Sequence, residues 1–543
     1  MSRRPLPSRL PLRRPPPRGL MPRRLLPAVL AAALSACTVV GPDYVRPELP
    51  VPAEYRQLPP SGWKASEAGD RLPRGAWWTV FDDPVLSALA GQAVRSNASI
   101  AVGEATVRRA RAQLAQTESA RYPSLGASAG GSRTTSSVAN ELGGGTQSSE
   151  TWRAGVDASW EIDLWGRVRR SVEAGSAQLA AADADLENVR LVIITELARN
   201  YFALRIVDAQ RQLFDDTVAA YQRSLELTRN RYASGVVPRV DVVQAEVQLK
   251  STLAQRIDSD LQRAALESTI AVLVGRMPST FQIDPITAAP PRPGGALAAN
   301  EKPELAPVAE PPGIPRVPVI PVGLPSTLLE RRPDVAAAER SIAAANAQIG
   351  VAEAARYPSL SLSASAGLRG SSFSDLLRAP SWLWSPALSI AQALFDAGQR
   401  RAVTEQTRAG YEAQLASYRG VVLQAFKEVE DNLASLRVLE QELALQTETL
   451  AAARLALQLV TNQYQAGVVN YLNVITAQTS ALNSERSLLD LRGRRLAASV
   501  ALIRALGGGW QAGAGTGSEP GAGSEPESES ESEPGAGSGL ERR

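Results

Sequence analysis

Two long segments of the chain repeat one another, and this repeat constrains the fold more than any other feature of the sequence. The stretch Asn230–Val237 (NRYASGVV) returns at Asn462–Val469 (NQYQAGVV), and Arg121–Leu125 (RYPSL) returns unchanged at Arg356–Leu360. Both pairs are separated by roughly 230 residues, far more than the unit of a solenoid. The sequence therefore predicts two related halves, each with the same order of long helices and short strands.

Residue types and charge exclude several classes of function. The 543 residues include no His and a single Cys, Cys37, which excludes imidazole metal centres, disulfides within the chain and His-dependent catalysis. Residues 1–36 contain eight Arg and no acidic residue, and without them Lys+Arg falls from 58 to 50 against 55 Asp+Glu. The rest of the chain is therefore mildly acidic, which argues against nucleic-acid binding. No phosphate-binding Gly loop is recognisable, and we expect neither enzyme activity nor a cofactor.

The N-terminus has the features of an export signal. A stretch rich in Arg and Pro ends at Arg24, and the apolar run 25–34 that follows is about half as long as the roughly 20 residues of a membrane-spanning helix. The run leads into Leu34–Cys37 (LSAC), which resembles a bacterial lipobox. We predict a signal peptide over 1–36 and a lipid on Cys37. The alternative is a buried structural Cys.

The rest of the chain divides by composition. Residues 37–83 are rich in Pro and polar residues and are predicted to be a tether. The first half spans 84–284 and the second half 331–509, with a Pro-rich linker over 285–330 between them. Residues 510–543 consist mainly of Gly, Ala, Ser, Glu and Pro, so we predict a disordered tail.

Both halves are predicted to be mainly helical. Residues 84–120 begin with Pro after an Asp and contain no further Pro, which favours a helix. Long Pro-free segments predict two further helices of roughly 100 Å, at 166–232 and 398–464. Each is followed by a tight turn and a returning helix, at 238–274 and 470–505. Ala is spread around these helices, as expected where each helix contacts neighbours on two sides.

Two β-hairpins are predicted from alternating polar and apolar residues, at 123–164 and 358–395. The alternation is clearest from Trp152 to Leu164. A soluble half-buried sheet and a sheet in a membrane would both show this period.

The membrane interpretation predicts aromatic residues at both ends of an apolar band about 25 Å tall. Trp152 and Trp160 lie eight residues apart on one face, which is roughly 26 Å along a strand. Trp382 and Trp384 are the candidates in the second hairpin. Four strands are too few to close a barrel, for which about eight is the practical minimum, so the strands require an oligomer.

Short motifs occur along the chain in a characteristic order: Cys37 with Gly41–Pro47, Trp77-Trp78 with Phe81–Pro84, Asp163–Arg167, Leu324–Ser326 with Arg331–Asp334, Leu394–Gly398 and Ala505–Trp510. Together they make the chain resemble the outer membrane factor lipoproteins of the NodT type, within the TolC/OprM superfamily. The resemblance covers roughly residues 34–510. It rests on the order of the motifs, because each motif alone is weak.

The resemblance implies a TolC-like homotrimer. Three copies of four strands would form a 12-stranded β-barrel in the outer membrane, continuous with a long α-helical barrel in the periplasm. In the family this duct is the passive exit of a tripartite efflux system, in which a periplasmic adaptor joins it to an inner-membrane RND-type pump. The protein would be lipid-anchored in the outer membrane of a Gram-negative bacterium and contact its lipids. A lipid-anchored periplasmic helical-hairpin adaptor or scaffold is the alternative, and the Trp-bearing hairpins argue against it.

The turns between the long helices and the returning helices are candidate contact sites for the adaptor. A Gly in each turn is expected at positive φ. Two Val residues follow each Gly, and exposed Val at a loop tip usually requires a partner. The candidate residues are Gly235, Val236, Val237, Gly467, Val468 and Val469.

Residues just beyond the turns are candidates for the narrowest part of the duct. Family members commonly carry an acidic residue here, but this chain has Thr476 at that position. Asp241 of the first half aligns with Asn473, and in a trimer it would place three like charges around the axis. Alternatively, Asp241 is a solvated residue in the first turn of a helix. Tyr464 and Tyr232 are expected to pack between helices near this level.

Overall fold

A computed structural model describes residues 39–50, 52, 54–57, 76–138, 145–286, 313–320, 331–378 and 382–508. The predicted signal peptide, Cys37, most of the Pro-rich linker and the predicted disordered tail lie outside these residues.

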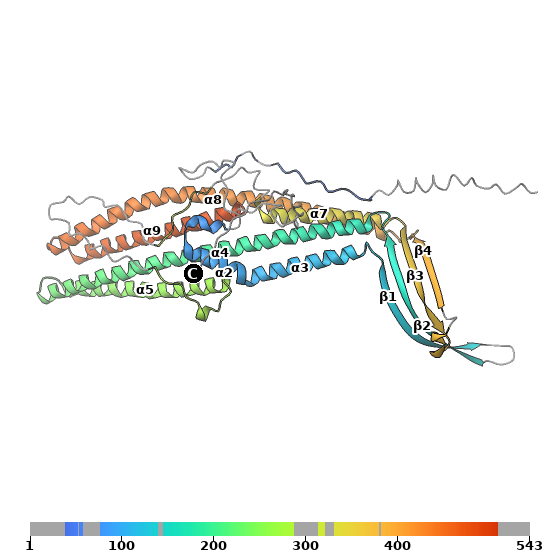
Figure 1. Cartoon of the computed structure of the whole chain (residues 1–543). Coiled ribbons are helices and arrows are strands. Elements are labelled where there is room, and N and C mark those ends of the chain that lie inside the picture. Colours follow the sequence, from blue (N-terminus) through green and yellow to red (C-terminus); the bar gives the residue numbers. More distant parts are fainter. Residues whose placement is uncertain are drawn as a thin grey trace, which may run out of the picture.

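The described residues form an elongated molecule with long helices at one end and a four-stranded sheet at the other (Figure 1). The elements are η1 (Trp77–Phe81), α2 (Pro84–Ser96), α3 (Ala98–Ser119), β1 (Ser124–Val138), β2 (Gly145–Ile162), α4 (Arg167–Ala233), α5 (Arg239–Leu273), η2 (Pro278–Thr280), α7 (Pro333–Ala354), β3 (Ser359–Gly370), η3 (Ser374–Leu377), β4 (Trp382–Ala391), α8 (Gln399–Gln465) and α9 (Tyr471–Ala505). The long helices α4 and α8 both have 67 residues, and the returning helices α5 and α9 both have 35.

Helix α4 organises the helical body, because it contacts α3, α5, α7 and α9 along its length. At 1.5 Å per residue, a helix of this length extends roughly 100 Å. The pairs α4–α5 and α8–α9 form two helical hairpins, and both turns lie at the end of the molecule opposite the sheet (Figure 1). None of the described helices is long and apolar enough to cross a membrane.

The single helix expected over 84–120 is interrupted at Asn97, which separates α2 from α3. Its backbone is extended, with ψ of 131°. Its side-chain oxygen accepts hydrogen bonds from the backbone N–H groups of Ser99 and Ile100 at 2.8 and 3.3 Å, and its amide donates to the Leu273 carbonyl at 2.8 Å. Asn is one of the best N-cap residues, and this tertiary contact to the end of α5 holds the break in place.

The main hydrophobic core lies at mid-length, where α2 and α7 meet the middle of α4 and α8 and the ends of α5 and α9. The ring of Phe81 packs on Phe202, with centroids 4.8 Å apart. One oxygen of Asp83 accepts from two backbone N–H groups in the first turn of α2, and the Tyr201 hydroxyl donates to the other oxygen at 2.7 Å. The aromatic segment before α2 is thereby fastened to α4.

The sheet is antiparallel throughout, with the strand order β1-β2-β3-β4, so β1 and β4 are its edges. Strand β2 ends at Ile162, before the expected Leu164. The carboxylate of Asp163 accepts from the backbone N–H groups of Val168 and Arg169 at 3.1 and 2.9 Å. The chain therefore leaves the sheet at this residue in order to begin α4.

The segment that follows the predicted lipidation site lies along the helices. The buried guanidinium of Arg170 in α4 donates to the carbonyl of Val40 at 3.3 Å and to the carboxylate of Asp43 at 2.7 Å. Farther along the segment, the Glu430 carboxylate in α8 accepts from two successive backbone N–H groups at 2.7 and 2.9 Å. The segment thus runs from the sheet end of the helical body toward its middle.

Candidate functional site

The two helical hairpins are joined near their turns by a small buried cluster. It consists of Leu225, Ala245, Tyr464, Tyr471 and Val474. The rings of Tyr464 and Tyr471 pack with centroids 5.3 Å apart, and the Tyr471 hydroxyl lies 3.1 Å from the hydroxyl of Ser224. Because Leu225 and Ala245 come from the α4–α5 hairpin and the other members from the α8–α9 hairpin, the cluster ties the two tips together.

Arg231, near the end of α4, adds a polar link between the tips. It donates a hydrogen bond to the Tyr464 carbonyl at 2.8 Å, and its guanidinium carbon lies 4.7 Å from the centre of the Tyr464 ring. The position that corresponds to Arg231 in the second half is Gln463, so the link has no counterpart there. A second link comes from Gln248, which donates to the hydroxyls of Tyr221 and Thr479 at 3.3 and 3.2 Å.

The turns have the geometry expected from their glycines. Gly235 and Gly467 have φ values of 73° and 77°, which confirms positive φ at both positions. Val236 is 61% exposed and Val468 is 73% exposed. The second Val of each pair, at positions 237 and 469, is only half-buried. Each tip therefore presents one largely exposed Val, where the sequence suggested two.

The candidate residues of the narrow region lie in different surroundings. Asp241 is 7% exposed, so the alternative of a freely solvated side chain is wrong. Burial raises the pKa of its carboxyl group. Asn473, at the matching position of the second half, is exposed. Thr476 is also exposed, and its hydroxyl donates to the Leu472 carbonyl at 3.0 Å.

The two tip tyrosines also differ in burial. Tyr464 is 3% exposed and packs between helices, as expected. Tyr232, its sequence counterpart, is 46% exposed, so the expectation that it packs between helices is wrong for the single chain. The reason lies in the neighbours: α9 packs against both α8 and α4, whereas α5 is packed mainly against α4.

Sequence reasoning missed Arg231 and Gln248. The signal for Arg231 was present, because it is a departure from Gln463 within an otherwise repeated motif. Gln248 carried no such signal, since its partners come from two different hairpins. Among the described residues, no group of three or more His, Cys, Asp or Glu side chains is arranged to hold a metal ion.

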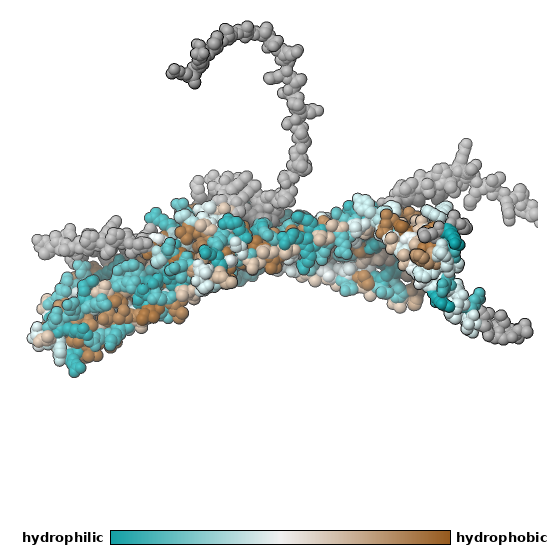
Figure 2. All heavy atoms as spheres, turned by 60° about the horizontal axis from the view of Figure 1, so that its bottom comes forward, coloured by the Kyte–Doolittle hydropathy of each residue, from teal (hydrophilic) through white to brown (hydrophobic). Residues whose placement is uncertain are grey.

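The sheet has one apolar face. Residues directly opposite each other in the register share a face. Where all four strands are paired, one side carries only apolar side chains and Gly. This face contains Leu125, Ala127, Ala129, Gly131, Trp152, Ala154, Val156, Ala158, Trp160, Ile162, Leu360, Leu362, Ala364, Ala366, Leu368, Gly370, Trp382, Trp384, Pro386, Leu388 and Ile390. The other face is mainly Ser and Gly with several charged residues. Hydrophobic side chains are visible over the strand end in Figure 2.

All four candidate tryptophans lie on the apolar face, but they are unevenly spread along it. Trp152 is opposite Gly370 and Trp382 is opposite Leu368, so both lie toward the end of the sheet far from the helices. Trp384 is next in line. Trp160 lies close to the helices, where its indole N–H donates to the Arg121 carbonyl at 3.1 Å.

The sequence profile of the family described as outer membrane efflux protein matches residues 89–276 and 324–508. The cation efflux system protein CusC of Escherichia coli O6:H1 is 29% identical over 482 residues, which cover 89% of this chain and 98% of CusC. The pyoverdine export outer membrane protein OpmQ of Pseudomonas aeruginosa is 29% identical over 488 residues, covering 88% and 96%.

Solved structures show the same likeness. The outer-membrane channel OprN superimposes with a TM-score of 0.76 at 29% identity, covering 87% of this chain and 99% of OprN. A crystal structure of CusC superimposes with a TM-score of 0.73 at 27% identity, covering 87% of this chain and all of CusC.

Proposed function

The chain belongs to the outer membrane efflux protein family, and we propose that it is the trimeric exit duct of a tripartite export system. It is an outer-membrane transport protein and not an enzyme, in agreement with the sequence prediction. As a duct it would passively conduct substrates delivered by an inner-membrane pump through a periplasmic adaptor.

The observation that carries this proposal is the sheet, with one apolar face and two unpaired edges. A long edge strand presents unpaired backbone N–H and C=O groups, which are costly where water is excluded. Within the described chain, β1 and β4 are these edges. Pairing β1 of each copy with β4 of the next would satisfy both edges, and three copies would close 12 strands into a barrel with its apolar face toward lipid.

The helical body supports the same assembly. Helix α5 exposes apolar side chains at the spacing of a coiled-coil seam, namely Val240, Val243, Val247, Ile257 and Leu261. Helix α8, on the far side of α4 and α9, exposes Val438, Leu445 and Leu459. In Figure 2, apolar side chains lie among polar ones along the tip half of the molecule. An α5-to-α8 contact between copies would cover both seams.

A lipid on Cys37 would suit the position of the segment that follows it. The backbone N–H of Val40 donates to the Trp165 carbonyl at 3.1 Å, at the point where sheet gives way to helix. Three residues extend the chain by at most about 11 Å, so the lipid would lie close to this junction. Mass spectrometry of the mature N-terminus would test the modification, and an unmodified or uncleaved Cys37 would contradict it.

The tips would contact the adaptor through the exposed Val236 and Val468. The buried cluster next to them, with Asp241, Tyr464, Asn473 and Thr476 at the same level of the hairpins, is the proposed narrow region of the duct. The exposed Asn473 and Thr476 would line the axis if three copies assemble as described, and the buried Asp241 and Tyr464 would support this level from within the hairpins.

Cargo selection would reside in the pump. The relatives named above are a cation efflux protein and a pyoverdine export protein, and a toluene efflux pump outer membrane protein, TtgI of Pseudomonas putida, is 28% identical to this chain. One type of duct therefore serves chemically unrelated substrates, as expected where small polar side chains line the passage.

Negative-stain electron microscopy of the detergent-purified full chain tests the proposal. We expect rods with threefold end views and a length above roughly 100 Å, the length of α4 alone. Compact or monomeric particles would overturn the trimeric duct and favour a lipid-anchored adaptor or scaffold.

A further inference from the structure

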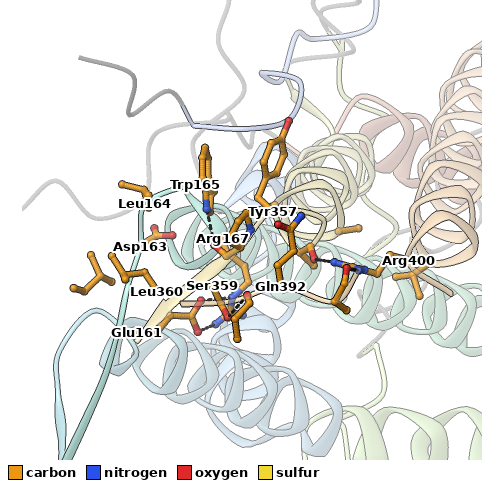
Figure 3. A pocket seen from close by; sticks show the side chains of 18 of the residues that line it. Glu161, Asp163, Leu164, Trp165, Arg167, Tyr357, Ser359, Leu360, Gln392 and Arg400 are labelled. Atoms are coloured by element: carbon orange, nitrogen blue, oxygen red, sulfur yellow. Dashed lines mark hydrogen bonds and ion pairs between the residues drawn. The ribbon is translucent and has the colours of Figure 1, made fainter. Parts of the chain in front are cut away.

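The chain passes from sheet to long helix at two junctions, and only the first is covered. At the first junction, between β2 and α4, the rings of Trp165 and Tyr357 stack with centroids 4.8 Å apart and planes at 24°. The Trp165 indole N–H also donates to the Pro358 carbonyl at 2.7 Å. Figure 3 shows both side chains at this junction. Val39 lies so close that a Cβ on Gly166 would come within 2.6 Å of it.

The second junction, between β4 and α8, also enters its helix through a Gly at positive φ, but it has no cover. Gly398 has a φ of 90°, close to the 83° of Gly166, yet a Cβ built on it would meet no atom within 4 Å. Leu394 and Phe395, which precede it, are 93% and 89% exposed. Both junctions line one cavity of about 730 Å³ (Figure 3), so they lie at the same level of the molecule.

Each junction has a Tyr on one side and a second aromatic residue, Trp165 or Phe395, on the other. Tyr357 belongs to the repeated RYPSL motif, and its counterpart in the first half is Tyr122. Trp165 follows Leu164 and directly precedes Gly166, whereas Phe395 follows Leu394 and lies three residues before Gly398. The two residues are therefore alike in type and in the preceding Leu, but not in their distance from the helix. Tyr122 is 71% exposed. Within the described residues, neither Tyr122 nor Phe395 belongs to a stacked or edge-on ring pair.

We propose that Tyr122 of one copy stacks on Phe395 of a second copy of this chain, as Tyr357 stacks on Trp165 within one copy. The proposal rests on the trimer put forward above and names a contact that holds it together. Inside the chain, the Tyr of the second half meets the aromatic residue of the first half. In a closed ring of three copies, the Tyr of the first half can meet the aromatic residue of the second half only between copies.

The proposed stack also sets the register of the strands between copies. Ile162 is paired with Leu360, three residues before Trp165 and three residues after Tyr357. The same offsets from Phe395 and Tyr122 place Gln392 opposite Leu125 of the neighbouring copy.

That register continues with Ile390 opposite Ala127 and Leu388 opposite Ala129, all of which lie on the apolar face of the sheet. A shift of one residue would bring the polar side chains of one strand onto the apolar face of the other. The proposed register therefore keeps the apolar face continuous across the new edge.

Cross-linking in the full-length protein tests the contact. We would combine Tyr122→Cys with Phe395→Cys, treat the purified protein with a short bis-maleimide and separate the products on a denaturing gel. Many other contacts would hold the trimer, so loss of the two rings should leave the thiols close together. We expect covalent dimers and trimers from the double variant and monomers from either single variant, which also controls for Cys37.

A matched control uses the pair within one copy. Trp165→Cys with Tyr357→Cys should consume its thiols with the same reagent while the band stays at the mass of a monomer. The protein could form rods with threefold end views and still give only monomer bands from the Tyr122 and Phe395 pair. That result would overturn this inference and leave the proposed function standing. Monomeric particles would overturn both.

A second measurement serves if the Cys variants do not fold. Phe395→Leu should speed dissociation of the trimer on heating by roughly two- to tenfold, the range expected from loss of one aromatic pair. Phe395→Trp should keep the dissociation rate of the original protein or lower it. In a Tyr122→Leu background, Phe395→Leu should have little further effect, because the pair is already lost. An equal effect in both backgrounds would overturn the stack.

Discussion

The tips of the two helical hairpins carry the same motif but have different surroundings. Tyr464 is 3% exposed in a buried cluster, and its counterpart Tyr232 is 46% exposed. Asp241 is buried, and its counterpart Asn473 is exposed. Related sequences therefore supply the same helices and turns, while the neighbours of each helix determine which positions become core.

The outer faces of α5 and α9 differ for the same reason. Val247 on α5 is 62% exposed, and the exposed residue at the matching position of α9 is Thr479. Leu261 is 69% exposed, while its counterpart Gly493 packs closely against Ile206 of α4. An apolar seam remains exposed on the helix at the edge, where a neighbouring copy would cover it.

The largest effect is expected from the exposed Val that both tips share. Val236→Asp combined with Val468→Asp should abolish export, because two charges replace the accessible apolar contacts of the proposed adaptor site. The trimer should persist, since both side chains are exposed. Resistance or export assays with parallel electron microscopy measure this. Val102→Asp is the matched control, because Val102 is 66% exposed on α3, far from the tips. Unchanged export by the double variant would show that these Val residues do not contact the adaptor.

Replacement by Ala should have very different effects on stability at the two corresponding tyrosines. Tyr464→Ala should destabilise its tip by about 3–5 kcal/mol, as for other large aromatic side chains removed from a core. Tyr232→Ala should change stability by no more than about 0.5 kcal/mol in the isolated chain. Hydrogen exchange of the backbone amides around each turn reports both values. Similar losses at the two sites would mean that the assembled protein buries Tyr232 as deeply as Tyr464.

A smaller effect is expected for the link that only the first half provides. Arg231→Gln introduces the residue found at position 463 and removes the hydrogen bond and the cation–π contact to Tyr464. We expect a loss of about 1–2 kcal/mol in the free energy of opening of the tip. Arg229→Gln, which breaks an exposed ion pair with Glu246, should cost at most about 1 kcal/mol. Equal losses from both variants would show that Arg231 acts only as a surface charge.

The smallest effect depends on pH. Because burial raises the pKa of Asp241, its ionisation opposes the folded tip, and stability falls as pH rises through that raised pKa. Asp241→Asn should therefore stabilise the tip slightly at pH 7. The gain should vanish below the ordinary Asp pKa of about 3.9. Asn473→Asp, at the exposed counterpart, should show little pH dependence in the same exchange measurement. A gain at Asp241 that is independent of pH would contradict this cause.

Much of the fold could be predicted from local sequence patterns. Freedom from Pro predicted α4 and α8, alternation predicted the strands, and the glycines predicted positive φ at positions 235 and 467, which the structure confirms. The break at Asn97 was missed, because its cap is completed by the Leu273 carbonyl at the end of another helix. The early end of β2 was missed because Asp163 fits the alternation, although its carboxylate accepts from backbone N–H groups in the first turn of α4.

The candidate site was predicted less completely than the fold. Motif comparison located the turns and the level of the narrow region, since the repeat marks both. It could not show that Val236 and Val468 are accessible while the Val after each is half-buried, or that Asp241 is buried. The contact of Arg231 with Tyr464 joins residues more than 200 positions apart, and no local pattern indicates such a pair.

The sequence by itself determined the long helices, the turns between them and the apolar face of each hairpin, because periodicity and the conformational preferences of Pro and Gly act over a few residues. Only the tertiary structure decided which of two equivalent residues is buried, which junction is covered and which helix keeps an exposed apolar seam. Burial depends on side chains contributed by distant segments, so the same motif becomes core at one tip and surface at the other.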